Sequence, residues 1–297
     1  MDFGDLSIEL LTDGFVQVDA GGPFGLVPRL LYEPFFQPDA GNRIPQSLTC
    51  MLLRSEGKTI LIDTGLGPKL TSRQEKRWGL DRSAGGVVEQ LAAKGITPAA
   101  VDLVINTHLH WDHCGGNTRL DGEAIVPSFP NATYLVQRSE WSQASHPDAR
   151  TQGTYFSNNF ETLLASGQME LLQGDSQVTR HVRCVVTPGH TRAHQSVVLE
   201  AGVWRGLFVA DMASYAVNMT KTAWLPSYDV LPLENVRTKQ VWQRWALEND
   251  AWLFFQHDPF TPLATLSPDT GAGLGLVVPE GAGELTGAIP TPTLPTG

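Results

Sequence analysis

The sequence has few of the features that mark membrane, secreted or nucleic-acid-binding proteins. Its three cysteines, Cys50, Cys114 and Cys184, are widely separated and do not make a disulfide framework. No apolar stretch approaches the ~20 residues that span a bilayer, and the first residues lack the basic and apolar regions of a signal peptide. Positive charge is scarce. The net charge is −10 and no Lys/Arg run is visible, which argues against a nucleic acid or an anionic membrane as partner. These absences predict a cytoplasmic protein.

The remaining composition is that of a globular protein. The 297 residues are 41% apolar and 18% charged, which suffices for a large core in one big domain or two ordinary ones. Residues 6–18 alternate loosely around Asp13-Gly14 and predict a first hairpin. The irregular segment 20–46 is rich in glycine, proline and aromatic residues, so it either walls a substrate pocket or packs on the core or on a second subunit, as in a homodimer. Residues 281–297, rich in glycine, proline and threonine, predict a poorly ordered tail.

The histidines are unevenly distributed. Three of the eight, with one aspartate, lie within six positions: His108, His110, Asp112 and His113. The apolar run 101–106 before them predicts a strand. Because residues i and i+2 of an extended chain point to the same side, His108 and His110 can reach one metal ion together. Asp112 and His113 can then face a second ion close by.

The type of ligand narrows the choice of metal. Gly115-Gly116 would let the backbone turn tightly after the motif. Imidazole and carboxylate groups without thiolate favour zinc first, with manganese, iron or cobalt as alternatives. Cys114 directly follows a candidate ligand, but a buried free cysteine is the commoner outcome.

This motif resembles the signature of the metallo-β-lactamase fold superfamily, and further candidate ligands follow in the family's order. Each stands at the end of an apolar run: His190, Asp211 and His257. The resemblance implies one metal on His108, His110 and His190, a second on Asp112, His113 and His257, and Asp211 bridging the two. Asp63, in the turn Asp63-Thr64-Gly65, would orient a ligand histidine. His194 would have a structural role rather than bind metal.

The resemblance also implies the architecture. The fold class is α/β, a four-layer αββα sandwich with the metals at one edge. Residues 1–280 would form a single domain of two similar αβ halves, followed by the tail at 281–297.

One stretch narrows the function within the superfamily. Residues 187–196 resemble N-acyl-homoserine lactone lactonases and methyl-parathion-hydrolase-like enzymes, although Arg192-Ala193 replaces the usual Pro-Gly. The leading prediction is therefore a metal-dependent hydrolase that opens a lactone or cleaves an ester, with two divalent ions as cofactors. N-acyl-homoserine lactones, as in quorum quenching, are the leading substrates, and organophosphate and aryl esters are expected side activities. A hydroxide held between two cations would attack the carbonyl.

Several side chains are candidates for catalysis or substrate binding. Asp112 is both a ligand and a catalytic candidate. The lactonases place a tyrosine shortly after the bridging aspartate, where it hydrogen-bonds the substrate oxygen. Here Tyr215 stands one residue later than that pattern and Ser214 occupies the matching position. Phe24 and Trp111 are candidates for lining an apolar acyl pocket, and Met212 is a weaker one; the alternative for each is a place in the core.

Other functions are weaker. A glyoxalase-II-type thioesterase is the nearest alternative, but no basic cluster for glutathione carboxylates is visible. RNA-processing members are disfavoured by the acidic charge. Flavodiiron-type reductases carry an acidic residue where this chain has His110, and need a flavin domain for which no length remains. A metal-binding protein without catalysis is disfavoured because all seven ligand positions are filled.

Overall fold

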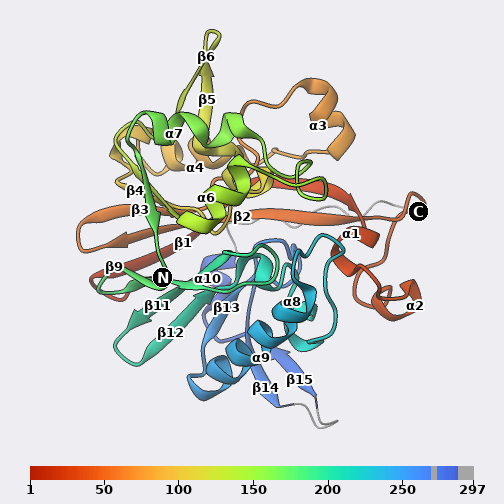
Figure 1. Ribbon diagram of the computed structural model, residues 1–297. Helices are drawn as coiled ribbons and strands as arrows, with labels where there is room; N and C mark the ends of the chain where they lie inside the picture. The colour runs from red at the N-terminus through yellow and green to blue at the C-terminus, as the bar shows by residue number, and fades with distance from the viewer. Residues whose placement is uncertain (269–272, 287–297) are drawn as a thin grey trace.

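Two β-sheets form the centre of the computed structural model, which describes residues 1–268 and 273–286. The first sheet has the order β1-β2-β3-β4-β7-β8, made of β1 (Leu6–Asp19), β2 (Arg43–Ser55), β3 (Lys58–Ile62), β4 (Leu103–Ile105), β7 (Thr133–Gln137) and β8 (Met169–Leu172). The second has the order β15-β14-β13-β12-β11-β10-β9, made of β9 (Ser176–Thr179), β10 (Val182–Val186), β11 (Gln195–Ala201), β12 (Trp204–Phe208), β13 (Trp252–Phe254), β14 (Leu263–Pro268) and β15 (Leu274–Val277). A separate ribbon, β5 (Thr118–Asp121) and β6 (Ala124–Pro127), projects from the molecule (Figure 1).

Helices lie around the two sheets. They are α1 (Gly21–Phe24), α2 (Arg29–Tyr32), α3 (Ser72–Trp78), α4 (Val87–Ala93), α5 (Trp111–Cys114), α6 (Arg138–Ser145), α7 (Glu161–Ala165), α8 (Ala216–Thr220), α9 (Pro232–Glu248) and α10 (Ala282–Thr286). Short 3-10 turns lie at η1 (Pro98–Ala100), η2 (Gly115–Asn117), η3 (Ser157–Asn159) and η4 (Ala210–Met212). Figure 1 shows α4, α6 and α7 on one side of the paired sheets and α8 and α9 on the other.

Three apolar clusters hold these layers together. The inner cluster joins the two sheets through side chains such as Ile62 and Phe254. A second cluster packs α4, α6 and α7 on the first sheet, and a third packs α8 and α9 on the second. Burial of these apolar faces is the main stabilising contribution to the fold. The expected four-layer αββα arrangement is therefore confirmed.

The predicted first hairpin is wrong. Residues 6–19 form one long strand, β1, which pairs with β2 along its whole length. Asp13-Gly14 makes a bulge between Thr12 and Phe15 instead of a turn. The reason is tertiary: the Asp13 carboxylate accepts hydrogen bonds from the Gly67 backbone N–H at 2.9 Å and from Arg82 at 2.6 Å.

The C-terminal stretch is partly ordered, contrary to the expected tail. Residues 282–286 form α10, whose Ala282 and Leu285 are buried in the inner cluster. Residues 287–297 lie outside the described part of the chain. Within the described ranges no helix is long and apolar enough to cross a membrane.

The irregular segment 20–46 has two faces. Phe24, Tyr32 and Phe36 are buried and pack with Tyr215. Other large apolar side chains of the segment are exposed, namely Leu26, Leu30, Leu31 and Phe35. An exposed apolar face of this kind is compatible with a second subunit, so the homodimer stays a prediction.

Candidate metal centre

Seven side chains from both sheets meet at one edge of the sandwich. The first half of the chain supplies four of them after β4: His108, His110, Asp112 and His113. The second half supplies three, which follow β10, β12 and β13: His190, Asp211 and His257. They form three overlapping groups, each with ligand atoms within 4.8 Å of one another: His108 with His110 and His190, His108 with His113 and Asp211, and Asp112 with His113 and His257.

Asp211 lies at the centre of this arrangement. Its Oδ2 is 3.2 Å from His190 Nε2 and 3.4 Å from His113 Nε2, and its Oδ1 is 3.1 Å from His257 Nε2. One carboxylate therefore faces both sets of imidazoles. The Asp112 carboxylate approaches only one set, at 3.8 Å from His113 Nε2 and 3.7 Å from His257 Nε2.

The donor set fits divalent metal ions. The Nε2 atoms of His108 and His110 are buried and have no hydrogen-bond partner in the described part of the chain. Burying a polar atom without a partner is costly, and coordination would remove that cost. Burial lowers the pKa of His108 and His110 well below the usual value, and neighbouring imidazoles act in the same direction. Neutral imidazoles are the form that binds metal.

The Asp211 carboxylate and the imidazoles around it shift each other's pKa. Burial opposes a charge on His113 and His190, but the surrounding carboxylates, first that of Asp211, together outweigh burial and raise the pKa of both. Burial likewise opposes ionisation of Asp211. The neighbouring imidazoles, first that of His257, hold the pKa of Asp211 well below its usual range. Asp211 therefore stays ionised.

Hydrogen bonds on the far side of the rings fix their orientation. Asp63 Oδ2 is 3.0 Å from His113 Nδ1, which confirms the expected contact of Asp63 with a candidate ligand. Asp229 Oδ1 is 3.0 Å from His190 Nδ1, and the Ser47 carbonyl accepts from His257 Nδ1 at 2.7 Å. Sequence reasoning missed Asp229 and Ser47. Asp229 sits in a loop without a recognisable pattern, and Ser47 acts through its backbone.

Gly115 and Gly116 have a different role from the expected tight turn. Neither has a positive φ, and Gly115 has an ordinary helical φ of −58°. A Cβ on Gly115 would lie 2.2 Å from the Leu66 carbonyl oxygen, and one on Gly116 would lie 2.3 Å from that of Thr64. The glycines are needed because two backbone segments touch here, not because the chain turns.

Two further side chains near the motif are structural. The Cys114 thiol is buried and donates to the Leu109 carbonyl at 3.2 Å. His194 Nε2 accepts from the Asp211 backbone N–H at 3.1 Å, so it supports a candidate ligand rather than joining the donor groups.

The candidate substrate residues are placed differently from one another. Trp111 is half-buried, stacks on Trp78 with ring centroids 4.2 Å apart, and lines a cavity of about 280 Å³. Phe24 and Met212 are fully packed, at 0% and 1% exposure, in apolar clusters. Their roles in substrate binding stay predictions.

Tyr215 is also enclosed. It is fully buried and its hydroxyl donates to the Pro45 carbonyl at 3.3 Å. Ser214 donates to Asp211 Oδ1 at 3.1 Å, so the residue at the lactonase tyrosine position contacts the central carboxylate.

A loop between α8 and α9 brings two side chains to the centre that sequence reasoning did not select. Tyr228 and Asp229 are neighbours in this loop. Arg150 anchors it by donating to the carbonyls of Ser227 and Asp229, both at 2.8 Å. No local pattern could have marked the loop, because its partners lie far away in sequence.

Tyr228 faces the candidate ligands. Its ring stands edge-on to that of His190, with centroids 5.8 Å apart. Tyr228, His110 and Arg150 contribute to the lining of a cavity of about 210 Å³. The Tyr228 hydroxyl has no hydrogen-bond partner among residues 1–268 and 273–286. Burial, reinforced by the Asp211 charge, raises the pKa of Tyr228 well above its usual value, so the hydroxyl keeps its proton.

The model of the metallo-beta-lactamase superfamily matches residues 44–262 of this chain. The chain belongs to that superfamily. N-acyl homoserine lactonase AttM from Rhizobium radiobacter is 30% identical over 225 residues, which are 70% of this chain and 80% of that protein. An N-acyl homoserine lactonase from a Bacillus species is 27% identical over 231 residues, which are 73% and 84% of the two chains.

Solved structures agree with this assignment. A probable metal-dependent hydrolase from Staphylococcus aureus has a TM-score of 0.84 at 25% identity, covering 94% of this chain and 99% of that one. AidC, a dizinc quorum-quenching lactonase in complex with a product, has a TM-score of 0.75 at 20% identity, covering 94% and 96%. The predictions of the metallo-β-lactamase fold and of a metal-dependent hydrolase are confirmed.

Proposed function

We propose that this chain is a two-metal hydrolase that opens a lactone or cleaves an ester, with N-acyl-homoserine lactones as the leading substrates. The observation that carries the proposal is the shared position of Asp211 between two groups of histidines. The lactonase names of the relatives support the substrate class. Aryl ester and organophosphate hydrolysis are proposed as side activities of the same centre.

The proposed ligand sets follow the geometry. One ion, with zinc as the leading choice, would take His108, His110 and His190, and the other would take Asp112, His113 and His257. Asp211 would contribute to both. When bound, two divalent ions lower the pKa of a shared water towards ~7 and polarise a carbonyl oxygen.

The surrounding side chains have separate tasks in this proposal. Asp63 and Asp229 hold the rings of His113 and His190 in place. Asp112, whose side chain is 15% exposed against 5% for Asp211, is placed to take up a proton from the attacking water. The Tyr228 hydroxyl donates a hydrogen bond to the carbonyl oxygen as negative charge develops there. Tyr228 is favoured over Tyr215 because the hydroxyl of Tyr215 is already engaged with Pro45.

Metal content and a substrate panel test this function. We expect elemental analysis to find two transition-metal ions per chain, and lactone hydrolysis to be lost on chelation and restored by zinc or cobalt. The panel contains lactones, thioesters, phosphodiesters and a paraoxon-like triester. A thioesterase of the glyoxalase-II type would be recognised by its preference for the thioesters.

A matched pair of variants makes the test specific. Asp211→Asn removes the central charge, and we expect it to lower kcat/KM at least ~10³-fold and to reduce the metal content. Asp121→Asn, on the exposed part of β5, should leave both unchanged. The function would be rejected if the purified wild-type protein bound no transition metal, or if Asp211→Asn hydrolysed lactones as fast as wild type.

A further inference from the structure

A cavity of about 740 Å³ lies away from the metal centre, and none of the seven donors lines it. Its walls come entirely from residues 13–130: the loop after β3, the N-terminal end of α4, the turn at 97–99 and the segments flanking the β5–β6 ribbon. A volume of this size falls in the ~300–1,000 Å³ range of small-molecule sites.

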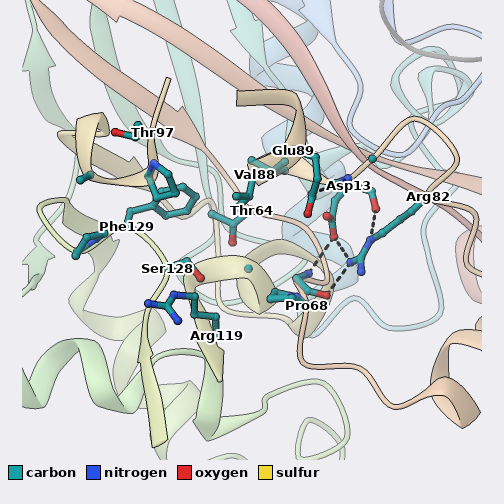
Figure 2. Close-up of a pocket in the computed structure, with 18 residues that line it drawn as sticks. Asp13, Thr64, Pro68, Arg82, Val88, Glu89, Thr97, Arg119, Ser128 and Phe129 are labelled. Carbon is teal, nitrogen blue, oxygen red and sulfur yellow. Dashed lines mark hydrogen bonds and ion pairs between the residues drawn. The ribbon is translucent and has the colours of Figure 1, made fainter. Parts of the chain in front are cut away.

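The lining is mostly apolar, and its charged groups lie at two ends. In Figure 2, Arg119, Ser128 and Phe129 lie on one side of the cavity and the Asp13–Arg82 pair lies on the other. Val88 lies between these two sides. A ligand that fills the cavity would therefore need a substantial hydrocarbon part.

The two ends differ in what they offer. At one end the charged groups already have partners: Asp13 and Arg82 are paired at 2.6 Å, and the Glu89 carboxylate accepts from the Gly86 backbone N–H at 3.1 Å. At the other end the exposed Arg119 side chain has no carboxylate within 4.0 Å in the described part of the chain, and its only hydrogen bond there is to the Leu120 carbonyl at 3.4 Å. Ser128 is 4% exposed, yet its hydroxyl has no partner among the described residues. An unpaired guanidinium beside an unpartnered hydroxyl fits a carboxylate.

We infer that this cavity binds a small amphiphilic carboxylate, with its head group at Arg119 and Ser128 and its hydrocarbon chain against Phe129 and Val88. The carboxylate satisfies the free donors at one end. The hydrocarbon chain of the ligand covers the apolar lining and removes it from water, which contributes about 25 cal/mol for each Å² buried.

The cavity is also connected to the metal centre. Thr64 belongs to its wall, and the Thr64 hydroxyl donates to the His113 carbonyl at 3.2 Å and to Asn117 Oδ1 at 2.9 Å. Thr64 directly follows Asp63, which orients the His113 ring. An occupant that shifts this wall changes the position of a metal donor, so the carboxylate acts as an effector. This regulatory part rests on the proposed two-metal function, whereas the binding itself does not.

Calorimetric titration tests the binding, with octanoate as the probe and 1-octanol as its uncharged counterpart. We expect one octanoate per chain, bound at least tenfold more weakly by Arg119→Gln than by wild type. Arg29→Gln, which changes an exposed arginine of α2, should bind octanoate like wild type. Val88→Trp fills the cavity and should abolish binding of both probes. Equal octanoate affinity in all four proteins, or no binding at millimolar concentration, would overturn the inference.

A second measurement tests the regulatory part. Zinc affinity is measured by competition with a chromophoric chelator, with and without saturating octanoate. We expect octanoate to change the zinc affinity of wild type at least threefold, because coupling between two sites is reciprocal. The zinc affinity of Val88→Trp should not change, because this variant does not bind octanoate. An unchanged zinc affinity in wild type overturns the coupling. Lactone hydrolysis without octanoate is assayed separately, so a failure of the proposed function is distinguishable from a failure of this inference.

Discussion

At the scale of single residues, the main question is which hydroxyl assists the reaction. Tyr215 and Tyr228 both follow Asp211 in the chain, but their surroundings differ. The Tyr215 hydroxyl is bonded to the Pro45 carbonyl inside an aromatic cluster. The Tyr228 hydroxyl is unpartnered among the described residues, and its ring lines a cavity together with His110.

Replacing each tyrosine by phenylalanine separates the two. We expect Tyr228→Phe to lower kcat on lactones by about 10²-fold with little change in KM, because the donor acts on charge that develops in the transition state. Tyr215→Phe should keep its turnover and lose about 1 kcal/mol of unfolding free energy. Steady-state kinetics measures the turnover of each variant, and urea unfolding measures its stability. Metal content serves as the control, because it should be the same in both variants. Loss of turnover in Tyr215→Phe with full activity in Tyr228→Phe would reverse the assignment.

Residues in short local motifs could be predicted from the sequence, and residues recruited from distant loops could not. His108, His110 and His113 lie within one motif of six residues. Extended geometry places His108 and His110 on one side, and the short helix α5 carries His113 directly after them. Asp229 and Tyr228 reach the centre only because the loop after α8 folds back onto His190. That contact depends on tertiary structure, which leaves no periodic signal in the chain.

At the scale of elements, close approach and tertiary pairing overrode the local signals. Asp13-Gly14 has the composition of a turn, yet β1 runs through it because Arg82 and the Gly67 N–H bind the Asp13 carboxylate. Gly115 serves a backbone contact that no sequence pattern announces. Long periodic or apolar segments can be recognised from the local sequence alone, so the strands before the donors were predictable.

The longest helix, α9, contains a buried lysine with consequences for pH. Lys239 is fully buried, and its Nζ donates to the carbonyls of Asn218 and Trp224 at 3.1 and 2.9 Å. Burial lowers the pKa of Lys239 to about 7, whereas an unfolded lysine titrates near ~10.4. Between these values the unfolded chain binds more protons, so the free energy of unfolding rises with pH from about 7 towards ~10.

Lys239→Met should remove this contribution. We expect the stability of wild type relative to Lys239→Met to increase as pH rises from 7 to 10, by about 1.4 kcal/mol for each unit of pKa difference. Urea unfolding at several pH values measures it, with Lys76→Met on the exposed side of α3 as the control. A wild-type pH dependence unchanged in Lys239→Met would show that the buried amine stays charged in the folded protein.

At the scale of the whole molecule, the proposed metal centre links the two halves of the sandwich. The four donors of the motif follow the first sheet, and His190, Asp211 and His257 follow strands of the second. Ions held by both sets would connect the sheets at one edge, in addition to the apolar cluster between them. Metal binding would then contribute directly to the stability of the fold.

Removal of metal should therefore lower the thermal stability as well as the activity. An ion at 100 times its Kd stabilises the folded state by about 2.7 kcal/mol, and each kcal/mol shifts Tm by roughly 2–4 °C in a domain of this size. We expect chelation to lower Tm by at least ~5 °C and added zinc to restore it, as measured by calorimetry. Asp211→Asn lacks the central ligand, so its Tm should respond much less to the chelator. If wild type and Asp211→Asn had the same Tm with and without chelator, the apolar cluster alone would hold the sheets together, and the centre would have no structural part.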